Sequence, residues 1–187
     1  MTFEEVWNSG LHISQSIFKE EGEQLYKEVM KLPENSLIIE IGAYVGRSTH
    51  VLCTTAKLRN SKVISIDPFL PAFDGWHNSD PKSAFMENVF TKFDNIKLIE
   101  GYSNEVKEQV PNDIDFIFID GDHSYEGVKQ DIENYLPKLK PGATVAFHDY
   151  RGSSFHGLQQ AVDELTSNWH TVSYAYSLIV KQKPYEN

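Results

Sequence analysis

Two short apolar runs of the sequence, DFIFI and TVAF, are each followed directly by side chains that can carry chemistry. Asp120, Asp122 and His123 follow the first run, and His148 and Asp149 follow the second. If both runs are neighbouring parallel strands, their carboxyl ends meet at one edge of a sheet, so these side chains would converge there. Carboxylates and imidazoles bind divalent cations and accept protons. The spacing therefore predicts a metal-binding or acid–base site at this edge.

Asp120, His148 and Asp149 form the candidate set of metal ligands at this edge. Mg²⁺ prefers oxygen ligands, whereas an imidazole among the ligands also admits Mn²⁺ or Zn²⁺, and a site without metal stays open. His123 is the candidate base, because a neutral imidazole can take a proton from a hydroxyl group. Its alternative roles are a cap of the following helix and a hydrogen bond to Asp122.

A third feature is the stretch LIIEIGAYVGRS, residues 37–48. Glu40 lies near the end of its apolar run, and Gly42 and Gly46 enclose the turn that follows. Glycine lets the backbone approach a ligand closely, and the free N–H groups at the start of the next helix attract anions. The Ser48 hydroxyl would add a donor there. The alternative is a plain connection between a strand and a helix.

Asp67 ends the next apolar run, in ISIDPF, and suits a carboxylate that binds the hydroxyls of a ribose. A solvent-exposed cap of the strand is the alternative. The glycine spacing G-x-x-x-G lacks the close glycines of the dinucleotide pattern G-x-G-x-x-G. Together, Asp67 and the glycine turn favour a nucleoside with a small zwitterionic tail over a nicotinamide dinucleotide.

Short runs rich in β-branched and aromatic residues predict the strands that would place these residues. We expect strands at 37–41, 62–66, 96–100, 115–119 and 144–147, and helices at 14–32, 48–58, 81–93, 105–109, 125–139 and 157–167. Pro141 and Gly142 predict a turn before the fifth strand. Two late strands, 171–176 and 177–181, predict an antiparallel hairpin at the edge of the sheet.

The alternation of strands and helices predicts an α/β fold, a Rossmann-like doubly wound sheet that is mostly parallel and carries the C-terminal hairpin. The length of 187 residues fits a single domain. We expect an N-terminal helical segment at 1–33 and a cofactor-binding and catalytic core at 34–187.

The net charge of -10 disfavours a nucleic acid or an anionic membrane as partner, since both need clustered Lys and Arg. The single cysteine, Cys53, permits neither an internal disulfide nor a cysteine-built zinc site. The N-terminal residues do not form a signal peptide, and no apolar run reaches membrane-spanning length. We therefore expect a cytoplasmic protein with a small-molecule partner, and a homodimer is left open.

These motifs resemble those of a known family. EIGAYVGRS is similar to the first motif of class I S-adenosylmethionine-dependent methyltransferases, and especially to the GAYxGxS turn of the catechol O-methyltransferase group. The segment 115–150, DFIFIDGDHSYEGVKQDIENYLPKLKPGATVAFHDY, resembles bacterial small-molecule O-methyltransferases related to macrocin O-methyltransferase. The resemblance extends over roughly residues 37–165.

The resemblance implies S-adenosylmethionine as cofactor and assigns residues to its parts. Asp67 would hold the ribose hydroxyls, and Tyr102 and Ser103 would touch adenine, although Ser103 is also a candidate helix cap. The full set assigned to the cofactor is Glu40, Gly42, Ala43, Tyr44, Gly46, Ser48, Asp67, Pro68, Phe69, Tyr102, Ser103 and Asp120.

The resemblance also bears on the metal and the base. Catechol-type enzymes bind Mg²⁺ with an Asp at the position of Asp120 and an Asp–Asn pair at the next strand end, where this sequence has His148–Asp149. They carry a lysine base at the position of His123.

The expected activity is methyl transfer from S-adenosylmethionine to an oxygen, less readily a nitrogen, of a small molecule, with or without a divalent cation. The alternatives are a nicotinamide-dependent oxidoreductase and a non-catalytic cofactor-binding module. The segment 70–82, which contains Trp76 and His77, is expected either to cover the cofactor or to form an irregular surface loop.

Overall fold

The computed structural model describes residues 1–14, 16–71, 80–152 and 154–185. Most of the segment expected over the cofactor, including Trp76 and His77, lies outside the described residues. Within the described part of the chain, seven strands form one sheet. They are β1 (Leu37–Ile41), β2 (Lys62–Asp67), β3 (Ile96–Glu100), β4 (Ile114–Ile119), β5 (Leu139–Phe147), β6 (His170–Ala175) and β7 (Leu178–Gln182).

Helices separate the strands, as the alternating pattern predicts. They are α1 (Phe3–Ser9), α2 (Lys19–Lys31), α3 (Arg47–Leu58), α4 (Pro81–Phe85) with a π-helical turn (Met86–Phe90), α5 (Ser103–Val106) with a 3₁₀ turn (Lys107–Gln109), α6 (Tyr125–Tyr135) with a 3₁₀ turn (Leu136–Lys138), and α7 (His156–Leu165). None of these helices is both long and apolar enough to cross a bilayer within the residues described.

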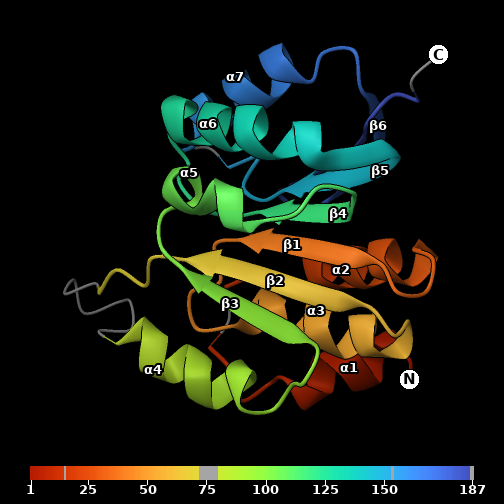
Figure 1. Cartoon of the computed structure of the whole chain (residues 1–187), viewed down its shortest axis with the longest axis vertical. Helices are drawn as coiled ribbons and strands as arrows, with labels where there is room; N and C mark the ends of the chain where they lie inside the picture. The colour runs from red at the N-terminus through yellow and green to blue at the C-terminus, as the bar shows by residue number, and fades with distance from the viewer. Residues whose placement is uncertain (15, 72–79, 153, 186–187) are drawn as a thin grey trace.

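The strands follow the order β3-β2-β1-β4-β5-β7-β6, and Figure 1 shows the first five of them stacked in this order. The strands β1 to β5 are parallel, and β7 is antiparallel to both β5 and β6. The prediction of a mostly parallel Rossmann-like sheet with an antiparallel C-terminal hairpin is confirmed. The chain reverses its direction of winding between β1 and β4, the place where such sheets bind ligands.

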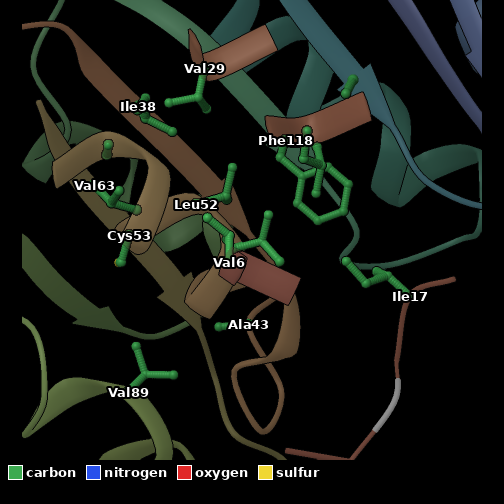
Figure 2. Packing of buried hydrophobic residues seen from close by; sticks show 14 of the residues in the cluster. Val6, Ile17, Val29, Ile38, Ala43, Leu52, Cys53, Val63, Val89 and Phe118 are labelled. Atoms are coloured by element: carbon green, nitrogen blue, oxygen red, sulfur yellow. The ribbon is translucent and has the colours of Figure 1, made fainter. Parts of the chain in front are cut away.

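The pleat of the central strands sends alternate residues into two apolar layers. Ile38 and Phe118 pack with α1, α2, α3 and the α4 segment, and Figure 2 shows this cluster. Ile39 and Ile117 pack on the other face with α5, α6 and α7. Helices cover both faces of the sheet, which agrees with the nearly continuous apolar sequences of β1 and β4. The packing on both faces holds the carboxyl ends of these strands in fixed positions.

Three features of the fold differ from the predicted elements. The expected helix start at residue 14 is wrong, because α2 begins at Lys19, where the Glu21 side chain accepts a hydrogen bond from the Phe18 N–H and so caps the helix. The expected turn at Pro141–Gly142 is also wrong, since β5 runs through it with a shift in register against β4. The helix α1 falls within the helical segment expected at 1–33, but it was not predicted as a separate helix, although Thr2 and Glu5 form a capping box at its start.

Candidate active site

A cavity of about 390 Å³ opens at the carboxyl ends of β1 to β4. Its walls come from the ends of these four strands and from the first turn after each. This volume is that of a small-molecule site. Of the residues assigned to the cofactor, the cavity is lined by Gly42, Tyr44, Asp67, Pro68, Phe69, Tyr102, Ser103 and Asp120. Asp67 and Asp120, which follow different strands, therefore line one cavity.

The floor of the cavity is the glycine turn after β1. Gly42 has a φ of 89°, and a Cβ atom at this position would lie 2.0 Å from the carbonyl oxygen of Asp120. Only glycine fits there, because any side chain would push β1 and β4 apart at the site. The turn therefore brings the backbone of β1 against the end of β4.

Asp67 connects the end of β2 to this turn. One of its carboxylate oxygens accepts hydrogen bonds from the Ala43 and Tyr44 N–H groups at 2.6 and 2.8 Å, and the other accepts one from the Phe69 N–H at 2.6 Å. The oxygen bonded to Phe69, Oδ1, has a further lone pair, whereas Oδ2 already accepts two hydrogen bonds. The carboxylate is thus fixed in position, and Oδ1 can still accept a hydrogen bond from a ribose.

Three residues at the rim adopt the left-handed backbone region that L-residues rarely occupy. Tyr44, Phe69 and Asp149 have φ angles of 48°, 50° and 56°. Each conformation costs on the order of 1–2 kcal/mol, so the surrounding contacts must impose it. Strained residues of this kind gather at binding and catalytic sites, and all three here were predicted site residues.

Four residues assigned to the cofactor, Glu40, Ala43, Gly46 and Ser48, do not line the described walls of the cavity. Glu40 is completely buried below the turn, where its carboxylate accepts hydrogen bonds from the hydroxyls of Ser48, Thr49 and Ser65 at 2.6 to 2.7 Å. Glu40 and Ser48 therefore contact each other and hold α3 and β2 to β1.

Burial raises the pKa of Glu40 to about 7, and the three hydroxyls only partly oppose this rise. The charged form of a carboxyl group is disfavoured away from water unless enough donors surround it. Glu40 thus titrates near neutral pH while its neighbours hold the glycine turn in place.

Asp120 is the residue where the cavity meets a cluster of acids and imidazoles. Its Oδ1 lies 3.0 Å from His148 Nδ1 and 3.3 Å from His123 Nε2. The other ring nitrogen of His148 lies 2.9 Å from the carboxylate of Glu21, which is fully buried on α2. A chain of contacts therefore runs from the α2 helix through His148 to the cavity wall.

His148 is held between carboxylates on both sides of its ring. Burial would lower its pKa, but the hydrogen bonds with Asp120, Asp149 and Glu21 outweigh it and raise the pKa to about 12. Both ring nitrogens of His148 therefore lie beside carboxylates, and the ring orients Asp120 from behind. The assignment of His148 as a metal ligand stays a prediction.

The three ligand atoms that do gather belong to Asp120, His123 and Asp149, and they all lie within 4.8 Å of one another. His123 Nε2 lies 3.6 Å from Asp149 Oδ2, and its ring packs against Phe155 at 4.4 Å between centroids. Burial lowers the pKa of His123, but the hydrogen bond and charge of Asp120 and the charge of Asp149 raise it overall. The set that gathers among the described residues therefore contains His123, where the predicted set has His148.

Ser103 does more than begin α5. Its hydroxyl donates a hydrogen bond of 2.5 Å to Asp131 on α6, while Tyr102 occupies the cap position. Burial raises the pKa of Asp131 to about 6, and the bond from Ser103 opposes this rise. Ser103 thus lines the cavity and ties its wall to the neighbouring helix.

Glu21, and Gly121 in the cavity wall, were not predicted as site residues. A signal for Glu21 was present, because it lies four residues before Leu25 and so shares the apolar face of its helix. An acid on such a face is rarely buried without a partner. Its partner, His148, could not be foreseen from spacing alone.

Residues 39–150 match the sequence profile of the methyltransferase domain family, and this match covers more than half of the chain. The chain belongs to that family. The matched segment contains the glycine turn, Asp67 and the whole acid–imidazole cluster except Glu21.

An uncharacterized protein of Acanthamoeba polyphaga mimivirus, R132, is 31% identical over 118 residues, which are 60% of this chain and 51% of the viral protein. The chain thus spans about half the length of this relative. Among solved structures, the O-methyltransferase NovP superposes with a TM-score of 0.73 at 16% identity, over 91% of this chain and 82% of its own. The SAH-bound methyltransferase PaMTH1 of Podospora anserina has a TM-score of 0.70 at 14% identity, over 99% and 88% of the two chains. These structural likenesses concern the fold.

Proposed function

We propose that this protein transfers a methyl group from S-adenosylmethionine to a hydroxyl oxygen of a small molecule, with assistance from a divalent cation. One observation carries the proposal: Asp120 both lines the cavity at the switch point and belongs to the acid–imidazole cluster. The transferred methyl group and the acceptor hydroxyl would therefore meet beside one residue. The names of NovP and of the family agree with this activity.

The cavity offers a suitable contact for each part of the cofactor. Asp67 would accept a hydrogen bond from a ribose hydroxyl, and Tyr102 and Phe69 would pack beside the adenosine. The sulfonium would lie over the turn at Gly42, close to Asp120, whose negative charge favours a cation.

The reaction is an in-line displacement that needs orientation and removal of a proton. The acceptor oxygen forms a bond to the methyl carbon while the bond from carbon to sulfur breaks, and its electron pair stays on sulfur to give S-adenosylhomocysteine. The hydroxyl proton passes to His123, or to water where His123 serves as a ligand. Asp120 and Asp149 hold the His123 ring at the rim in either case.

Asp120, His123 and Asp149 are suited to hold the cation. Two carboxylate oxygens and one imidazole nitrogen fit Mn²⁺ or Zn²⁺ better than Mg²⁺, which prefers oxygen alone. When bound, such a cation lowers the pKa of a hydroxyl group that it coordinates. His148 and Glu21 would keep Asp120 oriented toward it, as partners behind metal ligands do.

The acceptor is proposed to be a small molecule, because the rim carries acids and imidazoles and the protein has a net charge of -10. A nucleic acid would meet repulsion at this surface.

Labelled methyl transfer tests the proposal. The protein is incubated with S-adenosylmethionine carrying a labelled methyl group and with a panel of sugar, phenol and polyketide hydroxyl acceptors, with and without EDTA. We expect transfer to at least one acceptor, a loss of about 100-fold in EDTA, and recovery on addition of Mn²⁺. Full transfer in EDTA would remove the cation from the mechanism and leave His123 as the base.

Variants of two histidines sharpen this test. His123→Gln should reduce transfer, and the exposed His170→Gln on β6 is the matched control. Binding of S-adenosylhomocysteine without transfer to any acceptor would favour a non-catalytic module instead.

A further inference from the structure

We propose that the hollow between α1, the segment joining α1 to α2, and the start of α3 binds a small oxyanion, a phosphate or a carboxylate group. This hollow is lined by Trp7, Leu11, His12, Ile13, Ser14, Lys19 and Arg47. It shares no lining residue with the cavity at the strand ends. The proposed site is thus separate from the one for the nucleoside.

Arg47 is the central observation. Only 2% of its surface is exposed, and its Nε and Nη1 atoms are buried without a hydrogen-bond partner. No carboxylate within the described residues pairs with this guanidinium. Its contacts are the Trp7 ring, 3.8 Å from the guanidinium carbon, and a long bond of 3.4 Å from Nη2 to the Trp7 carbonyl oxygen.

A buried guanidinium with free donors is unfavourable unless an anion satisfies them. Its planar fork of N–H groups matches a carboxylate or a phosphate, to which it can donate two parallel hydrogen bonds. The Trp7 ring holds the guanidinium plane in place from one side. Arg47 is therefore preorganised for an oxyanion.

The surroundings of Arg47 are basic although the protein as a whole is acidic. His12 lies in the wall of the hollow, and its Nε2 is 3.1 Å from Lys92 Nζ. Lys19 also lies in the wall and is paired with Glu4. The pKa of the buried His50 is lowered to about 4. Burial is the largest cause, and the charges of Arg47, His12 and Lys92 lower it further. A local positive potential of this kind attracts an anion.

Gly10 keeps room for the guanidinium. A Cβ atom at this position would lie 2.8 Å from Arg47 Nη1 and 2.6 Å from the ring of His50. The end of α1 therefore closes over Arg47 without displacing it, and Arg47 stays in the wall of the hollow.

Titration calorimetry with inorganic phosphate, and in a second series with acetate, tests the site. We expect the full chain to bind one equivalent of at least one of these anions, and Arg47→Met to weaken binding at least about tenfold. Arg151→Met is the matched control, because Arg151 also stacks on an aromatic ring, Tyr174 at 3.9 Å, but is exposed. Its anion affinity should match that of the unchanged protein.

A titration with S-adenosylhomocysteine separates this site from the nucleoside cavity. Arg47→Met should leave that affinity unchanged. A parallel loss of both affinities would assign Arg47 to the carboxylate of the cofactor and overturn a separate site. Absence of anion binding to the unchanged protein, or equal binding by Arg47→Met, would also overturn it.

If Arg47→Met fails to fold, Lys92→Met and His12→Gln take its place. Both should weaken anion binding measurably, because His12 lines the hollow and Lys92 places a positive charge beside His12. Unchanged affinity in both variants would then contradict the proposal.

Discussion

Replacing Asp120 with asparagine is expected to lower kcat/KM for methyl transfer by about 10³-fold. Asp120 is the shared contact of the two imidazoles and the cavity, with Oδ1 at 3.0 Å from His148 and 3.3 Å from His123. An amide retains the shape of the side chain but loses the charge that holds both rings. It also replaces one anionic candidate ligand for a cation by a neutral amide oxygen, which attracts a cation less strongly.

Initial rates with a saturating acceptor measure this effect, and titration with S-adenosylhomocysteine shows whether cofactor binding survives. Asp94→Asn is the control, because Asp94 is exposed and forms only a surface ion pair with Lys57. Its rate should equal that of the unchanged protein. An Asp120→Asn protein that binds cofactor and turns over normally would contradict the role assigned to Asp120.

The second large effect concerns stability and comes from Glu40. Because the folded pKa of about 7 lies above the unfolded value of 4.5, the folded state holds this proton more tightly than the unfolded chain. The stabilisation is fully present below about pH 4.5 and is lost as the pH rises to about 7, a change of about 3 kcal/mol. The side chain in Glu40→Gln cannot ionise, so this variant should keep its stability as the pH rises. The free energy of unfolding of the variant minus that of the unchanged protein should therefore increase by about 3 kcal/mol from about pH 4.5 to about pH 8.

Urea unfolding at the two pH values measures the difference. Glu23→Gln on α2 is the control, since the Glu23 side chain is about half exposed and pairs with Lys27 at the surface, so its effect should stay within about 0.5 kcal/mol. A free-energy difference between Glu40→Gln and the unchanged protein that does not vary with pH would show that Glu40 ionises normally in the fold.

The fold was largely predictable because its signals are local. The apolar runs at 37–41 and 115–119 are continuous, as expected of strands covered on both faces, and the alternation with helices restricts the topology. The run of β5 through Pro141–Gly142 was not predictable in the same way. Proline and glycine indicate a turn locally, whereas the pairing of Leu139 with Ile114 and the backbone hydrogen bonds of Gly142 and Ala143 with Lys183 extend the strand backward.

The site was predictable where a residue directly follows a strand. Asp67, Asp120 and Asp149 reach the rim because parallel strands end there together. The direction of a side chain at that rim is set by distant partners. Glu40 turns downward to three hydroxyls, and His148 turns to Glu21, which is 127 residues away in the chain. Spacing along the sequence carries no information about such contacts.

The most direct test of the account is a crystal structure of the protein with S-adenosylhomocysteine. The account predicts the ligand in the cavity at the ends of β1 to β4, with the ribose hydroxyls on Asp67 and the sulfur facing Asp120. Electron density for the ligand at another surface, or none in crystals grown with saturating ligand, would contradict it.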